Sequence, residues 1–216
     1  GVLPDSVDPE HDPIRQGALW GNIMAGGAGV EYYFGYAYPE SDLTLQDFRS
    51  RDIMWDQSRY ALDFFSDNGI PFWDMESNSA LASGEDNWVL VDTAMTVAVV
   101  YFQSGANTTL NFTNALAGQY SLQWFNPRTG GNLVADPDTP VTGPGMVTLS
   151  RTSGVPYSDK DWVILIQPST APVTPTSGPV TPGPTPEPTP EPTPEPTPEP
   201  TPEPTTEPTP ETTTEP

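Results

Sequence analysis

Six short segments rich in valine, threonine and aromatic residues recur in the middle of the chain. They lie at 87–92, 96–103, 108–112, 120–125, 146–149 and 162–167, with turn-forming clusters such as those at 104–107 and 126–131 between them. Short strands at this spacing, punctuated by glycine, asparagine and proline, are typical of an antiparallel β-sandwich. Because about 90 residues suffice for one compact sandwich core, we predict an all-β domain over residues 75–167.

The first 74 residues have a different pattern, a helix followed by a strand and a second helix. Asp12 and Pro13 supply an N-cap and a first helical residue, so a helix should begin there and run to about residue 25. A run of small residues then leads into a predicted buried strand at 29–35, and a second helix should follow at about 45–66. This order is the repeating unit of α/β proteins, but the segment is too short for a complete barrel of roughly 250 residues.

Glu31 lies inside the predicted strand and is the best candidate for chemistry. If side chains alternate, Gly29, Glu31, Tyr33 and Gly35 share one face of that strand. An unpaired buried carboxylate is costly. Glu31 should therefore be paired with a cation, hydrated at a strand end, or catalytic.

The only histidine, His11, lies among carboxylates just before the first predicted helix. Together with Asp8, Glu10 and Asp12 it has the composition of a metal site. A single histidine in such a loop more often caps a helix and forms hydrogen bonds, so we expect no metal and no other cofactor.

The chain is strongly acidic, with a formal net charge of −22 and only seven Lys and Arg residues. Nucleic acids and anionic membranes are bound through clustered Lys and Arg, so this composition argues against both partners. No apolar run approaches the roughly 20 residues that span a bilayer, which predicts no membrane insertion. The absence of cysteine leaves the redox compartment open.

From Pro168 onward the sequence becomes a Thr-Pro-Glu-Pro repeat without aromatic residues, Lys or Arg. Such a segment cannot bury enough apolar surface to fold, so we predict a disordered, extended linker over residues 168–216. A linker of this kind holds a domain away from a further module or a cell-surface anchor.

Several longer motifs carry a resemblance to known families. The stretches at 18–22, 24–36, 49–52 and 55–57 look like the C-terminal end of an apiosidase-like (β/α)8 glycoside hydrolase barrel. The stretches at 124–131 and 159–166 resemble the β-sandwich that follows such barrels, whose family is labelled "putative collagen-binding domain of a collagenase". The resemblance implies a TIM-type barrel remnant at 1–74, the sandwich at 75–167 and the linker at 168–216.

The resemblance also implies an extracellular or cell-surface glycoside hydrolase that acts on plant or microbial polysaccharide. Retaining enzymes of this class use two carboxyl groups about 5 Å apart. Glu31 would then be catalytic with a partner in sequence upstream of this fragment, or would bind a sugar hydroxyl. Tyr33, Tyr36 and His11 are the candidate substrate-binding residues, and the two tyrosines could stack on a sugar ring. The fragment alone is expected to be inactive.

Two alternatives stay open at this point. The chain is a non-catalytic module on a Pro-rich tether that binds carbohydrate or collagen, or its sandwich merely seals the barrel. Collagen recognition needs exposed aromatic grooves, whereas the aromatic residues here alternate as in a core. Upstream sequence with further strand-helix repeats that end in acidic residues would favour the enzyme.

Overall fold

The structure is a computed structural model that describes residues 2–33, 48–105, 107–150 and 160–169. The chain divides into two units, Gly1–Pro172 and Val173–Pro216, and every described residue belongs to the first. The predicted linker therefore lies outside the described residues, apart from 168 and 169. None of the described helices is long and apolar enough to cross a membrane.

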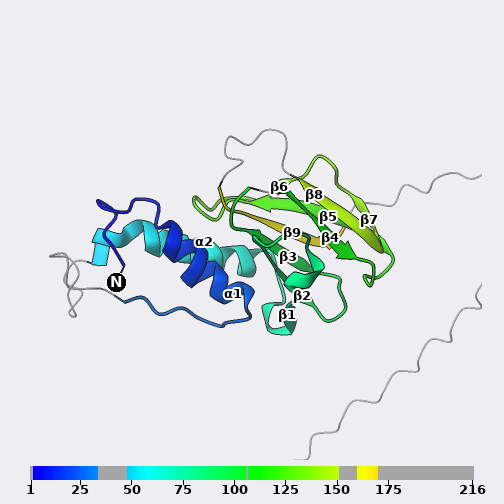
Figure 1. Ribbon diagram of the computed structural model, residues 1–216, viewed down its shortest axis with the longest axis horizontal. Helices are drawn as coiled ribbons and strands as arrows, with labels where there is room; N and C mark the ends of the chain where they lie inside the picture. Colours follow the sequence, from blue (N-terminus) through cyan, green and yellow to red (C-terminus); the bar gives the residue numbers. More distant parts are fainter. Residues whose placement is uncertain (1, 34–47, 106, 151–159, 170–216) are drawn as a thin grey trace, which may run out of the picture. The chain divides into compact units, whose positions relative to one another are not determined.

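The fold is built on a large antiparallel sheet (Figure 1). Its strands follow the order β1-β2-β3-β9-β5-β6, and β7 pairs with another part of β5. The strand bounds are β1 Met75–Ser77, β2 Asn87–Asp92, β3 Ala98–Phe102, β5 Gly118–Phe125, β6 Val134–Ala135, β7 Val141–Gly143 and β9 Trp162–Pro168. In the register of the central pair, Val100 of β3 lies opposite Ile164 of β9.

A second sheet covers one face of the large sheet and completes a sandwich. It consists of β4 (Asn107–Phe112) and β8 (Gly145–Ser150), in which Leu110 pairs with Val147. The core between the two sheets takes every second residue of the strands, as a pleated backbone requires. Its buried members include Val89, Val91, Ala98, Val100, Phe102, Leu110, Phe112, Leu122, Trp124, Val147, Leu149, Ile164 and Ile166.

Two helical segments form a third layer. The N-terminal one consists mainly of a π-helix, η1 (Ile14–Gly21), which continues as α1 (Asn22–Met24). The other begins with the 3-10 turn η2 (Phe48–Arg51) and continues as α2 (Asp52–Asp67), which runs beside the first (Figure 1). Two further 3-10 turns are η3 (Phe72–Asp74) and η4 (Ser79–Leu81).

The helices cover the face of the large sheet that β4 and β8 leave open. The residues that alternate with those of the sandwich core point to this second core. It contains Leu19, Trp20, Met24, Ala61 and Phe64 from the helices and Leu90, Val99, Tyr101, Phe125, Val163 and Leu165 from the sheet. All five residues of β3 are buried because the strand has a packed layer on each side.

The all-β prediction is confirmed. Each of the six predicted strands is present within two residues of its expected ends, whereas the short strands β1, β6 and β7 were not predicted. Both predicted helices are also present, although residues 45–47 of the second lie outside the described residues. The domain boundary at residue 75 stays a prediction, and the second core contains residues from both sides of it.

The predicted buried strand at 29–35 is wrong over its described part. Residues 29–33 have no regular structure, and Glu31 and Tyr33 are exposed. A strand is stabilised by hydrogen bonds to a neighbouring strand. In this stretch the Tyr33 carbonyl instead accepts a hydrogen bond at 2.6 Å from the amide of Val2, which belongs to no strand. The described residues therefore do not show a barrel remnant.

Candidate functional site

The sequence-predicted catalytic residue lies on a solvent-exposed segment. Glu31 follows α1 in the irregular stretch, and Tyr33, two residues on, is 72% exposed. Tyr36 lies outside the described residues. The catalytic role of Glu31 and the sugar-binding roles of Tyr33 and Tyr36 stay predictions.

His11 is far from exposed. Its side chain is fully buried, its Nε2 lies 2.7 Å from Asp5 Oδ1, and its amide donates to Asp8 Oδ1 at 3.1 Å. Asp5 also accepts a hydrogen bond from the Ile53 amide at the start of α2. His11 thus ties the N-terminal loop to α2, in agreement with a hydrogen-bonding role, and substrate contact stays a prediction. Within the described ranges, no group of three His, Cys, Asp or Glu residues could hold a metal ion.

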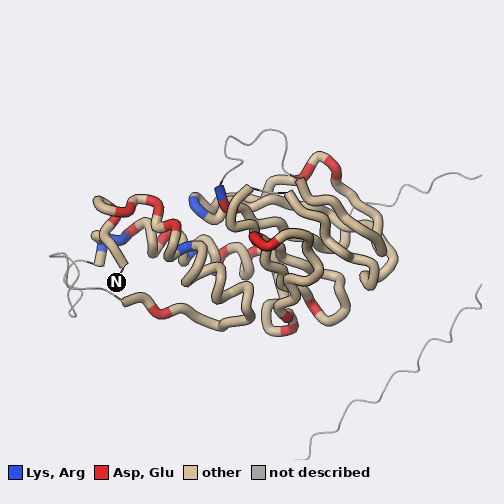
Figure 2. Tube along the Cα trace, in the orientation of Figure 1, with Lys and Arg blue, Asp and Glu red and all other residues tan. Residues whose placement is uncertain are grey.

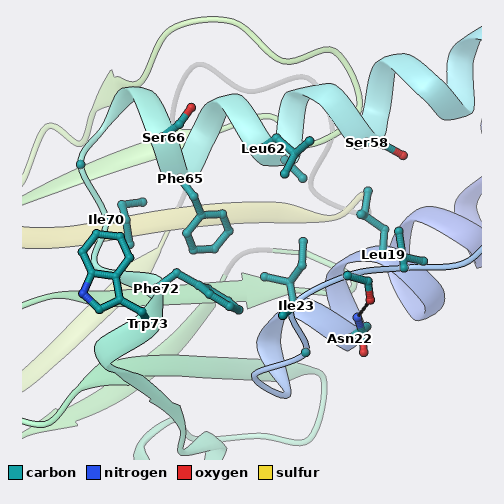
Figure 3. A pocket seen from close by; sticks show the side chains of 16 residues that line it. Leu19, Asn22, Ile23, Ser58, Leu62, Phe65, Ser66, Ile70, Phe72 and Trp73 are labelled. Atoms are coloured by element: carbon teal, nitrogen blue, oxygen red, sulfur yellow. Dashed lines mark hydrogen bonds between the residues drawn. The ribbon is translucent and has the colours of Figure 1, made fainter.

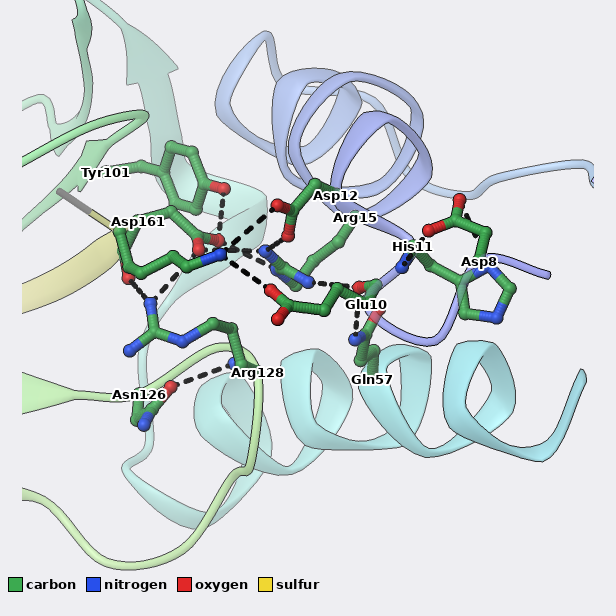
Figure 4. Close-up of polar contacts among 11 residues, drawn as sticks. Asp8, Glu10, His11, Asp12, Arg15, Gln57, Tyr101, Asn126, Arg128 and Asp161 are labelled. Carbon is green, nitrogen blue, oxygen red and sulfur yellow. Dashed lines mark hydrogen bonds and ion pairs between the residues drawn. The ribbon is translucent and has the colours of Figure 1, made fainter. Parts of the chain in front are cut away.

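The structure assembles a polar cluster that the sequence did not indicate, where the N-terminal helix meets the large sheet (Figure 4). Asp161, the residue before β9, is completely buried. Arg15 of η1 donates to both of its oxygens, from Nε to Oδ2 at 2.8 Å and from Nη2 to Oδ1 at 2.9 Å. The Tyr101 hydroxyl donates to Oδ2 at 2.7 Å, and Arg128 Nη1 donates to Oδ1 at 3.1 Å. One carboxylate therefore joins η1, β3, β9 and the 126–131 loop.

Further contacts hold the two arginines in place. Arg15 also donates to Asp12 and to the Glu10 carbonyl, and the Arg128 guanidinium lies over the Trp162 ring, 4.9 Å from its centroid. Lys160 Nζ forms an ion pair with Glu10 Oε2 at 2.7 Å on the exposed side of the cluster. The cluster is closed to solvent at its centre and bounded by a surface ion pair.

The electrostatics of the cluster favour its charged form. Burial alone would raise the pKa of Asp161, but the hydrogen bonds and charge of Arg15, with hydrogen bonds from Tyr101 and Arg128, lower it below its ordinary value. Burial alone would lower the pKa of Arg15, but the hydrogen bonds to Asp161 and Asp12, and the charges of these two residues, raise it above its ordinary value. Burial, reinforced by the charge of Asp161, raises the pKa of Tyr101, which stays a neutral donor.

An apolar cleft lies between the N-terminal helix and α2 (Figure 3). It has a volume of about 570 Å³. Its apolar lining includes Leu19, Ile23, Ala28, Val30, Ala61, Leu62, Phe65, Ile70, Phe72 and Trp73. Leu62 and Trp73 are 71% and 80% exposed, and the described lining residues include no carboxylate. This described lining therefore suits an apolar contact.

Charge is unevenly distributed over the described residues (Figure 2). Asp and Glu occur in both the helical and the β parts, whereas Lys and Arg gather in the helical segments and the loops that face them. Within the described strands β4 and β8 of the outer sheet there is no Lys or Arg. These two strands therefore supply no basic side chain that could contact a polyanion.

The missed residues left weak signals in the sequence. Arg15 is one of seven Lys and Arg residues in an acidic chain and lies on the same helix as the apolar Leu19 and Trp20. Asp161 directly precedes the apolar run of β9. A charge at the edge of a buried element must find a partner, but nothing local indicates that the partner lies 146 residues away.

Comparisons with known proteins match parts of this chain. Residues 77–167 match the family described as "Putative collagen-binding domain of a collagenase". A solved structure titled "Glycoside hydrolase" is similar over 73% of this chain and 37% of its own, with 18% identity and a TM-score of 0.55. A glycoside hydrolase family 5 structure from Bacteroides vulgatus ATCC 8482 is similar over 73% of this chain and 36% of its own, with 15% identity and a TM-score of 0.54. No curated protein matches.

The structural likeness covers more of the chain than the family match does. Residues 77–216 are 140 of 216 residues, about 65% of the chain, so a match over 73% must include residues before 77. The likeness therefore extends to residues that precede the segment matched by the family model. The chain spans little more than a third of the length of these solved structures.

Proposed function

We propose that this chain is the C-terminal part of an extracellular glycoside hydrolase, in which the sandwich is a non-catalytic accessory module. The similarity to two glycoside hydrolase structures supports this proposal, because it covers 73% of this chain and so includes residues before the segment that matches the sandwich family. In the finer form of the proposal, the helices close an apiosidase-like barrel that acts on a plant or microbial polysaccharide. The tail then leads to a further module or to the cell surface.

The observation that carries the proposal is the apolar cleft of the helical layer. A Leu and a Trp side chain that stand free in water each forgo roughly 1.5–3 kcal/mol of burial free energy. Leu62 and Trp73 are exposed in this way at the mouth of the cleft. The cleft continues the second core outward, because Leu19, Ala61 and Ile70 belong to the core and also line the cleft. Contiguous exposed apolar surface of this kind marks an interface. The occupant we propose is the catalytic domain that precedes this segment.

Glu31 belongs to the same proposal. A two-carboxylate mechanism needs a partner carboxyl group about 5 Å away, and in this proposal the catalytic domain supplies that group to the exposed Glu31. In the full-length parent, Glu31→Gln should lower kcat at least about a hundredfold if Glu31 is the general acid or base. A loss below threefold would remove it from the mechanism.

The family match to 77–167 supports a second candidate, in which the sandwich binds collagen or carbohydrate without chemistry. The 216-residue chain should then bind immobilised collagen or an insoluble polysaccharide, and it should hydrolyse nothing. Binding to collagen but to no polysaccharide would favour this candidate over the accessory role.

The docking proposal is tested by Leu62→Asp in the full-length parent, with Leu116→Asp as the control. Leu116 is 60% exposed and lies between β4 and β5, outside the cleft. Leu62→Asp should split the thermal unfolding of the parent into two transitions and lower its activity, because a buried charge at the interface opposes docking. Leu116→Asp should change neither. Identical behaviour of the two variants would overturn the proposal.

A further inference from the structure

We infer that the sheet face around Asp161 is a receptor for one kind of partner. That partner is a helix that presents an arginine and, five residues later, a tryptophan, and this chain supplies it as η1 with Arg15 and Trp20. The inference goes beyond the accessory role proposed above. It gives the most polar part of the sandwich a binding function directed at the same chain, not at collagen or sugar.

The receptor side consists of sandwich residues alone. Asp161 supplies the acceptor, and Tyr101 and Arg128 fix its orientation by donating one hydrogen bond to each carboxylate oxygen. The stacking of Arg128 on Trp162 restrains that arginine in turn. The carboxylate is therefore positioned before a partner arrives. A bidentate guanidinium fits the remaining acceptor sites better than an ammonium, which has no fork of parallel donors.

The partner side is equally defined. Hydrogen bonds in a π-helix join residues five apart, so Arg15 and Trp20 lie on one face of η1, whereas an α-helix would place them about 140° apart. Both are buried. Arg15 reaches Asp161, and Trp20 stacks on Tyr101 with ring centroids 5.3 Å apart and planes at 15°. The irregular winding of η1 thus aligns the two anchors with the two receptor residues.

The receptor discriminates against other helices through its buried charge. An apolar helix in the place of η1 would leave Asp161 enclosed without the two hydrogen bonds of Arg15 and with Arg128 as its remaining guanidinium partner, and breaking a buried ion network in this way is strongly destabilising. The stacked rings select for a flat ring at the second anchor, since both Trp20 and Trp88 lie nearly parallel to Tyr101, at 15° and 13°. Charge and shape together specify the partner.

The test uses the full 216-residue chain with Arg15→Ala, which empties the guanidinium position beside Asp161. Guanidinium ion at millimolar concentration should bind there and raise the thermal midpoint of the variant by about 2–4 °C over equal sodium chloride. The double variant Arg15→Ala/Asp161→Asn should show no rise, and neither should Arg59→Ala, whose ion pair is exposed. An equal rise in all three variants, or none in Arg15→Ala, would overturn the inference.

A second variant covers the case in which Arg15→Ala does not fold. Tyr101→Phe removes one hydroxyl from the receptor and leaves Arg15 in place. Amide hydrogen exchange over η1 and α1 should then accelerate at least tenfold more than exchange over β4 and β8, because only the helical layer depends on the receptor. An equal acceleration in both regions would refute a receptor role and assign the cluster to general stability.

Discussion

Trp20→Phe should leave the stability of the protein almost unchanged, although Trp20 is, with Trp124, among the largest fully buried side chains of the described residues. Its rings contact Phe64 at 5.8 Å and Tyr101 at 5.3 Å between centroids, and its exposure is 0%. Its indole Nε1 has no hydrogen-bond partner among the described residues. Phenylalanine loses packing worth about 1–2 kcal/mol but removes a buried unsatisfied donor that costs about 1–3 kcal/mol. The two effects offset each other to within about 1 kcal/mol.

Trp124→Phe is the matched control, because it makes the same truncation at an equally buried site. Trp124 is 2% exposed, and its Nε1 donates to Asp136 Oδ2 at 2.5 Å. Here the truncation costs the packing and also a hydrogen bond to a buried carboxylate, about 3–5 kcal/mol together. Both variants are compared with the wild type by urea unfolding at pH 7, followed by far-ultraviolet circular dichroism. A loss for Trp20→Phe as large as that for Trp124→Phe would refute the reasoning.

Two further predictions concern the polar cluster and the turn beside α2. Asp161→Asn should destabilise the protein by an amount that is constant from pH 7 to about pH 5 and shrinks below about pH 4. The pKa of Asp161 is lowered in the folded state, so its carboxylate contributes stability above the unfolded pKa of about 3.9, and this stability is lost as the carboxylate is protonated. Parallel curves of unfolding free energy against pH for wild type and variant, measured by urea titration, would contradict this. Gly130→Ala should cost about 1–2 kcal/mol more unfolding free energy than Gly131→Ala in the same assay. Both residues have positive φ, so the backbone strain is shared, but only a Cβ at 130 would meet the Tyr60 ring, at 2.4 Å. Equal losses would exclude that contact as the cause.

The sandwich could be predicted because each of its longer strands has a local sequence pattern. Alternation and turn residues place each strand, and the pleat then assigns side chains to faces. The same strands also carry a signal for a third layer. The apolar runs of β3 and β9 are continuous, with Val99 and Val163 as apolar as their neighbours, which indicates burial on both faces and so a third layer. The helices supply that layer.

The site could not be predicted in the same way. The predicted strand around Glu31 rested on local composition, but a strand forms only where a neighbour pairs with it, and the described chain offers residues 29–33 no such strand. The Asp161 cluster has the opposite problem. Its partners lie 146, 60 and 33 residues from Asp161 in sequence, so no local pattern connects them before the fold is known.

The ion pair and the apolar cleft are linked through the position of one helix. A buried ion pair contributes little net stability compared with apolar residues of the same size, because desolvation offsets the attraction. The ion pair instead fixes the orientation of the helix. The two hydrogen bonds from Arg15 to Asp161 allow η1 one rotation about its axis and one position along the sheet. The same helix carries Leu19 and continues into Ile23, which form one wall of the cleft opposite Leu62. A helix that could slide or rotate would close or deform that wall. The receptor around Asp161 therefore sets the shape of the surface on which docking depends, and a change in the cluster should weaken docking without touching the cleft.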